Sequence, residues 1–380
     1  MTVLLAPDSF KDCLSTDGVL QAMKQGVKFF NPKAKCITLP ASDGGEGFLK
    51  AVAVHLKGLE EIATNTLNPL GEPISGKFLW HKATNTAYIE LAQASGIELL
   101  SVKERNPAIT STFGTGIQIQ KAIEKGAQKI YLGIGGSATN DAGMGIAKAL
   151  GFNFFDAQGN ELAPIGENLA KVVRISRPES FQNIQFFAIN DVLNPLFGME
   201  GAAYTYARQK GANEQMIAEL DRGLAYFSEV VKNELGCDYA TLNGSGAAGG
   251  TAYGLKSFLN AKYISGTSFL LQLAQFDNLI KKHAVEVIIT GEGKIDGQTR
   301  YGKFIHGLIV EATKYQIPVL AVCGKLDLDA EGLKSLGLSQ AEELYDPSKS
   351  SSYSFENAPR LVSEKTFLVL KRHYETLLDY

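Results

Sequence analysis

The sequence predicts an α/β fold with parallel strands, arranged as two domains. One pattern recurs along the chain: a short β-branched run, a loop rich in glycine and polar residues, and then a helical periodicity. At 380 residues the chain also exceeds the size at which a single hydrophobic core keeps growing. Because both ends show the parallel pattern and the centre differs, we expect the centre to be an insertion into a discontinuous domain.

The N-terminal part follows this pattern twice. A strand is predicted at residues 2–6, and a helix opened by Ser15 or Thr16 follows the loop at 7–14. The apolar face of this helix consists of Val19, Met23 and Val27. The second strand, loop and helix are predicted at residues 35–39, 40–47 and 49–57.

The central part is more varied. Alternation at residues 76–80 and 86–90 predicts a β-hairpin. A further strand, loop and helix are predicted at residues 129–134, 135–145 and 146–150. A strand at 186–189 follows, and then an amphipathic core helix that begins after Asn213 and ends at Gly236.

The C-terminal part returns to the parallel pattern. A strand, a loop, a helix and a strand are predicted at residues 286–290, 291–299, 303–315 and 319–322. We therefore assign residues 1–70 and 284–380 to the discontinuous α/β domain, and residues 71–283 to the inserted mixed α/β domain.

The composition excludes several function classes. The net charge is −3 with no basic excess or stripe, so we expect no nucleic-acid partner. The four cysteines never form a CxxC pair, which argues against a disulfide framework or a zinc site and favours a reducing cytoplasm. We find neither a signal peptide nor an apolar run that could span a bilayer, and so expect a cytoplasmic protein with no membrane partner.

Carboxylates and glycines gather in the loops that follow the predicted strands. In open α/β sheets, ligands bind beyond the carboxyl ends of the strands. The five loops carry Asp8 and Lys11; Asp43; the run 135–141; Asn190 and Asp191; and Glu292, Lys294 and Asp296. Turn chemistry alone explains one such loop, whereas five of them indicate a ligand site.

These residue types suit a phosphate group and a metal ion. Glycines let backbone N–H groups approach an anion, and Ser137, Thr139 and Asn140 add side-chain donors. Mg²⁺ is usually held by one or two carboxylates, and another carboxylate can orient a substrate hydroxyl or take its proton. The candidate carboxylates are Asp43, Glu46, Asp141, Asp191, Glu292 and Asp296. The candidate cations for phosphoryl or carboxylate charge are Lys11, Lys210, Lys294 and Lys325.

A second glycine-rich stretch, at residues 244–251, leaves two interpretations open. It precedes an apolar helical pattern. Gly249 and its neighbours therefore form either another phosphate loop or a surface that lets a helix pack closely.

Two further motifs suggest other nucleotide sites. Residues 133–138 fit a dinucleotide fingerprint with Asp156 downstream, which keeps an NAD-linked dehydrogenase as an alternative. Against it, polar residues occupy positions 139–141, where the helix of that motif should already run. Residues 297–303 have P-loop spacing, but Phe304 stands where a Mg²⁺-binding Ser or Thr is needed, and we reject a P-loop.

Six motifs in order, from residue 6 to about residue 325, resemble those of the type I glycerate kinases. They are Pro7-Asp8-Ser9-Phe10-Lys11, Asp43-Gly44-Gly45-Glu46-Gly47, Gly135-Gly136-Ser137-Ala138-Thr139-Asn140-Asp141, Gln209-Lys210-Gly211-Ala212, Gly246-Ala247-Ala248-Gly249-Gly250 and Thr290-Gly291-Glu292-Gly293-Lys294-Ile295-Asp296. The resemblance implies a flavodoxin-like domain split by the inserted domain. It also implies phosphoryl transfer from ATP to D-glycerate, with 2-phosphoglycerate as the usual product. The chain departs from the family pattern at Asp12, Lys294 and Lys325, so a kinase for another small hydroxy acid remains an alternative.

The resemblance and the residue types together predict roles. ATP and Mg²⁺ are the expected cofactors, and D-glycerate is the expected substrate, within glycerate catabolism. The expected nucleotide contacts are Gly135, Gly136, Ser137, Thr139, Asn140 and Gly249. The expected catalytic residues are Asp191, Asp8, Lys11 and Asp296, of which Asp191 and Asp296 also hold the metal. The expected substrate contacts are Asp43, Lys210, Glu292 and Lys294. The sequence leaves the oligomeric state, monomer or homodimer, open.

Overall fold

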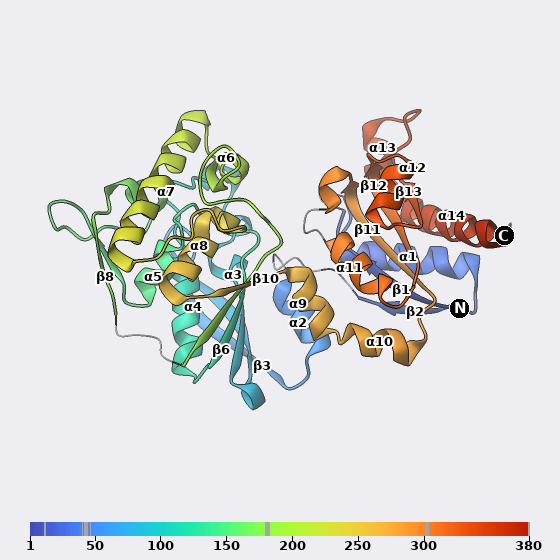
Figure 1. The fold of residues 1–380 in the computed structure, drawn as a ribbon, viewed down its shortest axis with the longest axis horizontal. Coiled ribbons are helices and arrows are strands. Elements are labelled where there is room, and N and C mark those ends of the chain that lie inside the picture. Colours follow the sequence, from blue (N-terminus) through green and yellow to red (C-terminus); the bar gives the residue numbers. More distant parts are fainter. Residues whose placement is uncertain are drawn as a thin grey trace. The chain divides into compact units, whose positions relative to one another are not determined.

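The computed structural model describes residues 1–10, 13–39, 41, 45, 47–178, 183–300 and 304–378 (Figure 1). The chain divides into two compact units. Unit 1 comprises residues 1–42 and 267–380, and unit 2 comprises residues 43–266. Both ends of the chain therefore belong to unit 1, and unit 2 is inserted into it.

Unit 1 is built on a five-stranded parallel sheet with the order β13-β12-β11-β1-β2. Its strands are β1 (Thr2–Pro7), β2 (Lys35–Thr38), β11 (Val287–Ile295), β12 (Val319–Leu326) and β13 (Gln340–Glu343). Counted within the unit and read from β2, the order is 2-1-3-4-5, which is the flavodoxin-like arrangement. The predicted fold class is confirmed.

The helices of unit 1 are α1 (Thr16–Phe30), α9 (Gly266–Leu273), α10 (Phe276–His283), α11 (Phe304–Thr313), α12 (Ala330–Leu336), α13 (Ser351–Glu356) and α14 (Ala358–Leu378). Of the two residues expected to open α1, Ser15 is the cap, because its hydroxyl accepts from the Gly18 N–H. The buried face of α1 shares one hydrophobic cluster with α14 and with strands β1, β11 and β12. This cluster holds the sheet whose strand ends carry the candidate residues of unit 1.

Unit 2 is built on a six-stranded mixed sheet with the order β10-β9-β6-β5-β4-β3. Its strands are β3 (Leu59–Leu67), β4 (Pro73–His81), β5 (Thr86–Glu90), β6 (Lys129–Gly133), β9 (Gln185–Ile189) and β10 (Lys262–Ile264). Strands β5, β6, β9 and β10 are parallel to one another. At the other side of the sheet, β4 pairs antiparallel with both β5 and β3. The pairing of β4 with β5 confirms the predicted hairpin. A small separate sheet joins β7 (Asn153–Phe155) to β8 (Arg174–Ser176).

The helices of unit 2 are α2 (Phe48–His55), α3 (Ala92–Ser95), α4 (Phe113–Glu124), α5 (Met144–Ala149), α6 (Ala202–Tyr206), α7 (Glu214–Leu235) and α8 (Ala247–Leu259). Asn213 caps α7 through its side chain, and Gly236 ends it with a positive φ, both as predicted. The buried faces of α4, α5, α7 and α8 form one hydrophobic cluster with the sheet.

The structure differs from the sequence predictions at both unit boundaries and in one loop. The units change at residues 42/43 and 266/267, whereas the sequence suggests 70/71 and 283/284. The first difference arises because β3 pairs along its whole length with β4, which ties it to unit 2. The predicted loop at 291–299 is wrong in its first half, because β11 continues to Ile295 and pairs there with the extended end of β12.

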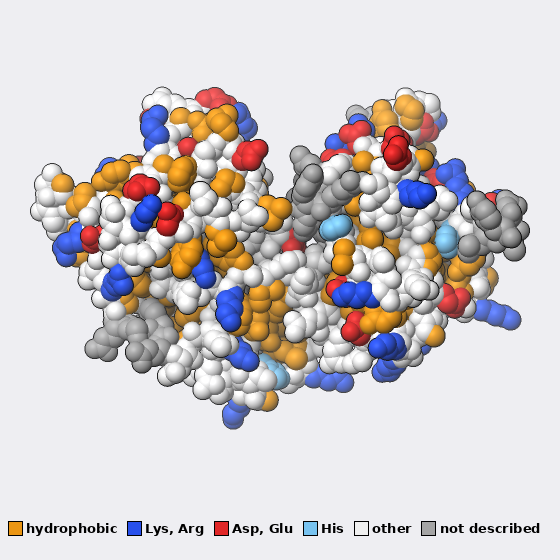
Figure 2. Space-filling model, in the orientation of Figure 1, with side chains coloured by type: hydrophobic (Ala, Val, Ile, Leu, Met, Phe, Trp, Pro, Cys, Tyr) orange, Lys and Arg blue, Asp and Glu red, His pale blue; other side chains and the backbone are white. Residues whose placement is uncertain are grey.

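Charged side chains of both signs are interspersed over the face drawn in Figure 2. Within the described part of the chain, no helix combines the length and the apolar character needed to cross a membrane.

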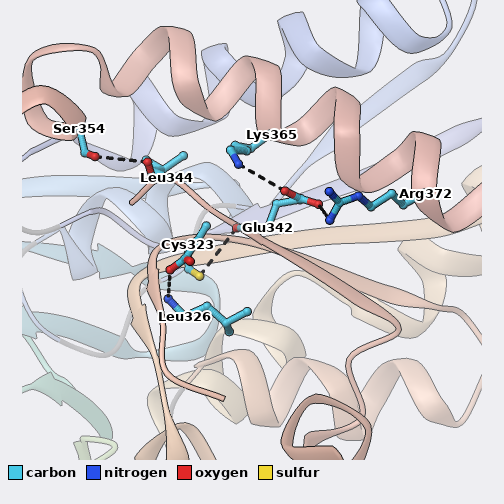
Figure 3. Close-up of polar contacts among 8 residues, drawn as sticks. Cys323, Leu326, Glu342, Leu344, Ser354, Lys365 and Arg372 are labelled. Atoms are coloured by element: carbon cyan, nitrogen blue, oxygen red, sulfur yellow. Dashed lines mark hydrogen bonds and ion pairs between the residues drawn. The ribbon is translucent and has the colours of Figure 1, made fainter. Parts of the chain in front are cut away.

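Helix α14 is tied to the edge strand β13 through the buried carboxylate of Glu342 (Figure 3). Glu342 forms ion pairs with Lys365 and Arg372, which both lie on α14. The Cys323 thiol on β12 contacts the Glu342 carbonyl oxygen at 3.8 Å. A buried carboxylate needs such cationic partners, and they fix this helix against the sheet.

Candidate active site

The parallel strands of unit 2 end side by side at one edge of its sheet. Glu90 at the end of β5 pairs with Gly133 on β6, and Gly133 pairs with Ile189 on β9. Ile189 in turn pairs with Ile264, the last residue of β10. Because ligands of open α/β sheets bind beyond the carboxyl ends of the strands, the segments that follow these strands form the candidate site of unit 2.

The most unusual group at this edge is the buried ammonium of Lys210. Lys210 ends a short 3₁₀ turn, and only 3% of it is exposed. Its Nζ donates to Ser137 Oγ and to the Thr139 carbonyl oxygen, both at 2.7 Å. Burial lowers the pKa of Lys210 to about 7, while the nearby Asp141 carboxylate favours the charged form. The structure thus joins Lys210 to two residues that the sequence assigns to the nucleotide.

Asp141 organises the same loop from within. Its Oδ2 accepts from the Thr112 N–H and hydroxyl, both at 2.8 Å, and from the Gly145 N–H at 3.1 Å. Its Oδ1 accepts from the Gly143 N–H at 3.2 Å. The residue is fully buried, and burial raises the pKa of its carboxyl while these donors oppose the shift. Asp141 therefore anchors the loop to the starts of α4 and α5, and its role as an oxygen ligand is not supported.

The second glycine-rich stretch packs directly against this loop. Ala248, Gly249 and Gly250 all have positive φ, so regular helix in α8 begins at Thr251. A Cβ at Gly249 would lie 2.0 Å from the Thr139 carbonyl oxygen, and the Gly249 carbonyl accepts from the Ala142 N–H at 3.1 Å. Of the two interpretations left open by the sequence, close packing is the one that the structure displays. A nucleotide contact by Gly249 remains a prediction.

Polar atoms of the loop are buried without partners in the described part of the chain. They are Thr139 Oγ1 and both side-chain atoms of Asn140. Thr139 is 0% exposed and Asn140 is 1% exposed. Buried polar groups in folded proteins are nearly always hydrogen-bonded, so orphaned ones call for a ligand or an ordered water. Together with the Lys210 ammonium, they fit an anionic ligand such as a nucleotide phosphate.

Asp191 lies at the same sheet edge. Its Oδ1 accepts from the Ser265 hydroxyl at 2.6 Å, and the preceding Asn190 donates its N–H to Ile264. The loop that begins at Ile134 is adjacent, since the Ile134 N–H reaches the Ile189 carbonyl at 3.3 Å. The structure therefore brings Asp191 to the strand end next to the one that carries the 135–141 loop.

Glu90 fixes the start of α2. This buried carboxylate, at the end of β5, accepts from the Leu49 N–H at 3.0 Å through Oε2. A carboxylate at a helix N-terminus is favoured by the helix dipole. Helix α2 directly follows the predicted Asp43–Gly47 motif, of which Asp43 itself lies outside the described residues.

In unit 1 the candidate residues stand where the strand order reverses, between β1 and β11. Asp8 follows β1, donates its N–H to the Gly291 carbonyl at 2.8 Å and accepts from the Ser9 N–H through Oδ1. Lys11 lies outside the described residues.

The end of β11 carries a network of paired charges. Thr299 donates through Oγ1 to Glu292 at 3.0 Å and accepts from the Asp296 N–H at 3.1 Å. The Lys294 ammonium lies 3.0 Å from Asp296 and 3.1 Å from Asp327. Hydrogen bonds to Asp296 and Asp327 raise the pKa of Lys294. Lys294 is therefore held in its charged form between two carboxylates.

The described candidates thus form one cluster in each unit. Unit 1 groups Asp8, Glu292, Lys294 and Asp296, and unit 2 groups Gly135, Gly136, Ser137, Thr139, Asn140, Gly249, Lys210 and Asp191. No three His, Cys, Asp or Glu residues among those described converge as a metal-binding group. Mg²⁺ in phosphate sites needs only one or two carboxylates, so Asp191 and Asp296 remain predicted ligands.

Sequence reasoning missed several residues that complete these clusters. They are Glu90, Thr112, Ser265, Thr299 and Asp327. A Thr- and Gly-rich stretch at residues 110–116 is an available signal for Thr112. The others are single polar residues whose partners lie close only in the folded chain.

The dinucleotide fingerprint lacks its structural context. Residues 134–143, all of them described, form a loop, and α5 begins only at Met144. The helix that should open within the motif is therefore not there. Asp156 instead accepts from the Gln158 and Asn160 N–H groups in an exposed turn after β7. This geometry argues against the NAD-linked alternative.

Comparison with known proteins gives a consistent answer. Residues 3–372 match the model of the glycerate kinase family. A glycerate kinase of Halalkalibacterium halodurans is 38% identical over 346 residues, which cover 90% of each chain. A glycerate 2-kinase of Escherichia coli is 40% identical over 332 residues, covering 87% of this chain and 86% of that one.

A solved structure agrees with these relatives. A glycerate kinase 2 from Salmonella typhimurium superposes with a TM-score of 0.77 at 32% identity, covering 100% of this chain and 99% of that one. The family match spans nearly the whole chain, and the relatives share its length and its fold. The chain therefore belongs to the glycerate kinase family.

Proposed function

We propose that this enzyme transfers the γ-phosphoryl group of ATP, with Mg²⁺, to a hydroxyl of D-glycerate and yields 2-phosphoglycerate in glycerate catabolism. Family membership supports phosphorylation of glycerate, and a relative of 40% identity carries the name glycerate 2-kinase. The structural observation that carries the proposal is the buried cluster of Lys210, Ser137, Thr139 and Asn140, which combines a cation with orphaned polar atoms.

The proposal assigns phosphate binding to the 135–141 loop. Gly135 and Gly136 leave room for backbone N–H groups at the anion, and Ser137, Thr139 and Asn140 present polar side chains. Lys210 orders the loop through two hydrogen bonds and adds positive charge. Such donors act by neutralising the charge of the transferred phosphoryl group, without any covalent step by the protein.

The carboxylates take the second part of the chemistry. We assign Asp191 and Asp296 to orienting the substrate hydroxyl and to holding Mg²⁺, and we assign Asp8 and Lys11 to catalysis. When bound, Mg²⁺ supplies positive charge at the phosphate oxygens. The Ser265 hydroxyl restricts the Asp191 carboxylate, which favours a single productive orientation.

Substrate contacts are assigned to Asp43, Lys210, Glu292 and Lys294. Lys294 is flanked by Asp296 and Asp327, so its ammonium has a defined position. Within the substrate, a carboxylate and two hydroxyls require both cationic and anionic partners, which these residue types provide.

A coupled assay of ADP release with Mg²⁺-ATP and D-glycerate tests the proposal, with ³¹P NMR identifying the product. We expect glycerate-dependent ADP release and a 2-phosphoglycerate signal. L-glycerate and other small hydroxy acids serve as controls. A 3-phosphoglycerate signal would overturn the assigned hydroxyl alone, and folded protein without any glycerate-dependent release would overturn the substrate.

A further inference from the structure

Arg105 begins a segment that crosses the phosphate-loop candidates of unit 2. Within this segment, residues 105–112, the Thr110 hydroxyl donates to the Ala138 carbonyl at 2.9 Å. Thr112 gives both its N–H and its hydroxyl to Asp141. The segment is therefore attached to the 137–141 stretch at two points, and Arg105 lies at its start.

The backbone of Arg105 also touches the residue that follows Lys210. A Cβ placed on Gly211 would lie 2.1 Å from the Arg105 carbonyl oxygen and 3.1 Å from the Arg105 Cβ. Gly211 has a φ of +99°, a value that residues with a side chain rarely adopt. Only glycine fits this contact, which places the Arg105 side chain beside the turn that delivers the Lys210 ammonium.

The position of Arg105 is fixed on both sides. A capping box between Ser101 and Glu104 closes the turn before it. After it, Asn106 Oδ1 accepts from the Ala108 N–H at 3.0 Å, which shapes the next turn. The backbone at Arg105 is thus positioned by hydrogen bonds that do not involve the guanidinium.

The guanidinium itself has no protein partner within the described ranges. Neither an ion pair nor a hydrogen bond joins it to another described residue, and its Nε is buried without an acceptor. By contrast, the neighbouring Arg208 is exposed and paired with Glu214. Arg105 as a whole is partly exposed, but its Nε is buried, and a partly buried cation without a protein partner is favoured when an anion accompanies it, so the missing partner points to a ligand.

We infer that Arg105 is a further anion-binding residue of this site and donates to an anionic oxygen of the bound ligand. The inference rests on the proposed function and deepens it. A guanidinium presents a planar fork that matches phosphate and carboxylate oxygens alike. That oxygen belongs either to a nucleotide phosphate or to the carboxylate of the hydroxy acid, and separate titrations distinguish the two.

The test measures dissociation constants by calorimetry for ADP, inorganic pyrophosphate and D-glycerate, with Arg105→Gln, Arg105→Lys and the wild type. Loss of a hydrogen bond to a charged group weakens binding by about 10- to 100-fold, so Arg105→Gln should raise the dissociation constant of one ligand class by that factor. Arg105→Lys should recover part of the loss, because charge remains without the fork. Weaker binding of ADP and pyrophosphate would show that Arg105 contacts a nucleotide phosphate. Weaker binding of D-glycerate would show that Arg105 contacts the substrate carboxylate.

Arg208→Gln is the matched control, since it removes one exposed charge from the same turn as Lys210 and should leave all three constants nearly unchanged. Urea unfolding separates binding from structure: Arg105→Gln should be about as stable as the wild type, because the guanidinium has no hydrogen bond or ion pair with a described residue. Dissociation constants that Arg105→Gln leaves unaltered would overturn the inference, whether or not the stability of the variant is lower.

The binding test of Arg105 and the test of the proposed function can fail independently. Wild-type protein that binds ADP or pyrophosphate but releases no ADP with D-glycerate would overturn the proposed function, while the effect of Arg105→Gln on binding would still decide the inference. Wild-type protein that binds none of the three probes would overturn the inference directly.

Discussion

The Lys210 ammonium donates a 2.7 Å hydrogen bond to Ser137 Oγ across 73 residues of sequence. The same ammonium reaches the Thr139 carbonyl oxygen. One buried cation therefore ties a 3₁₀ turn to the loop that follows β6. This loop contains the orphaned side chains of Thr139 and Asn140, so its order and its ligand binding should depend on Lys210.

The charge of Lys210 should make stability depend on pH. Its folded pKa is lowered to about 7 by burial, whereas an unfolded lysine titrates near its ordinary value of about 10.4. Between these values the unfolded chain binds more protons, so the Lys210 contribution to the free energy of unfolding rises with pH, by at most about 1.4 kcal/mol per pH unit. Asp141 is the charged group that faces Lys210, and burial raises the pKa of its carboxyl while the donors of Thr112, Gly143 and Gly145 oppose the shift.

Urea unfolding of the wild type and Lys210→Met from pH 6 to pH 9.5 checks this. The difference in unfolding free energy should be flat below pH 7 and should shift in favour of the wild type above it. Lys121→Met, which removes an exposed lysine paired with Glu124, should show no such trend. A difference between wild type and Lys210→Met that stays constant over the whole range would refute the burial argument.

Replacing Asp141 by Asn should destabilise unit 2. The amide would turn an N–H₂ group toward donors that now point at a carboxylate oxygen, and we expect a loss of about 2–4 kcal/mol in the free energy of unfolding. Asp156→Asn is the control, because Asp156 accepts from two backbone N–H groups and the Asn160 amide in an exposed turn and should lose far less. Equal losses for the two variants would mean that the buried network is not what stabilises the loop.

Gly249→Ala should damage both stability and turnover. Alanine at positive φ costs about 1–2 kcal/mol by itself, and here its Cβ would also lie 2.0 Å from the Thr139 carbonyl oxygen. Gly236→Ala shares the positive φ but has open space around its Cβ, so it isolates the backbone cost. We expect Gly249→Ala to be the less stable of the two by a further ~2 kcal/mol or more in chemical denaturation. Equal stability of the two would contradict the close packing.

Asp191→Asn should lower turnover far more than stability. If its carboxylate orients the hydroxyl or holds the metal, we expect kcat to fall by about 100-fold or more in the ADP-release assay. Ser265→Ala, which removes only the hydroxyl that contacts Oδ1, should reduce kcat more mildly. Near-normal turnover of a folded Asp191→Asn protein would remove Asp191 from the mechanism.

Hydrophobic periodicity and turn residues in the sequence predict many of the helices and strands of this fold. The capped helices α1 and α7, the parallel strands and the β4–β5 hairpin all follow from periodicity and turn residues. Strand β3 escapes prediction because it lies at the edge of its sheet, and Glu60 and Glu61 there are exposed, which interrupts the alternation. The second half of β11 escapes because only pairing with β12 makes residues 292–295 extended.

The candidate site shows the same division. Its loops can be predicted from the sequence because glycine, Asp and Thr follow the strands. Many of the hydrogen bonds that order these loops come from residues distant in sequence, so they cannot be predicted in this way. Nothing near Lys210 in sequence indicates that it is buried against Ser137, and nothing near Lys294 indicates Asp327 as its second partner. Asp141 shows the converse: a carboxylate in a glycine-rich loop resembles a metal ligand until its four donors are known.

The central claim is that the loop held by Lys210 binds the nucleotide phosphates, and the affinity of Thr139→Val for Mg²⁺-ADP tests it most directly. Valine has nearly the same shape and removes only Oγ1, a buried atom with no partner among the described residues. The account predicts a dissociation constant raised by about tenfold, together with unchanged or higher stability, because an orphaned hydroxyl is replaced by a methyl group. An unchanged ADP affinity in the folded variant would contradict the claim that this loop contacts the nucleotide.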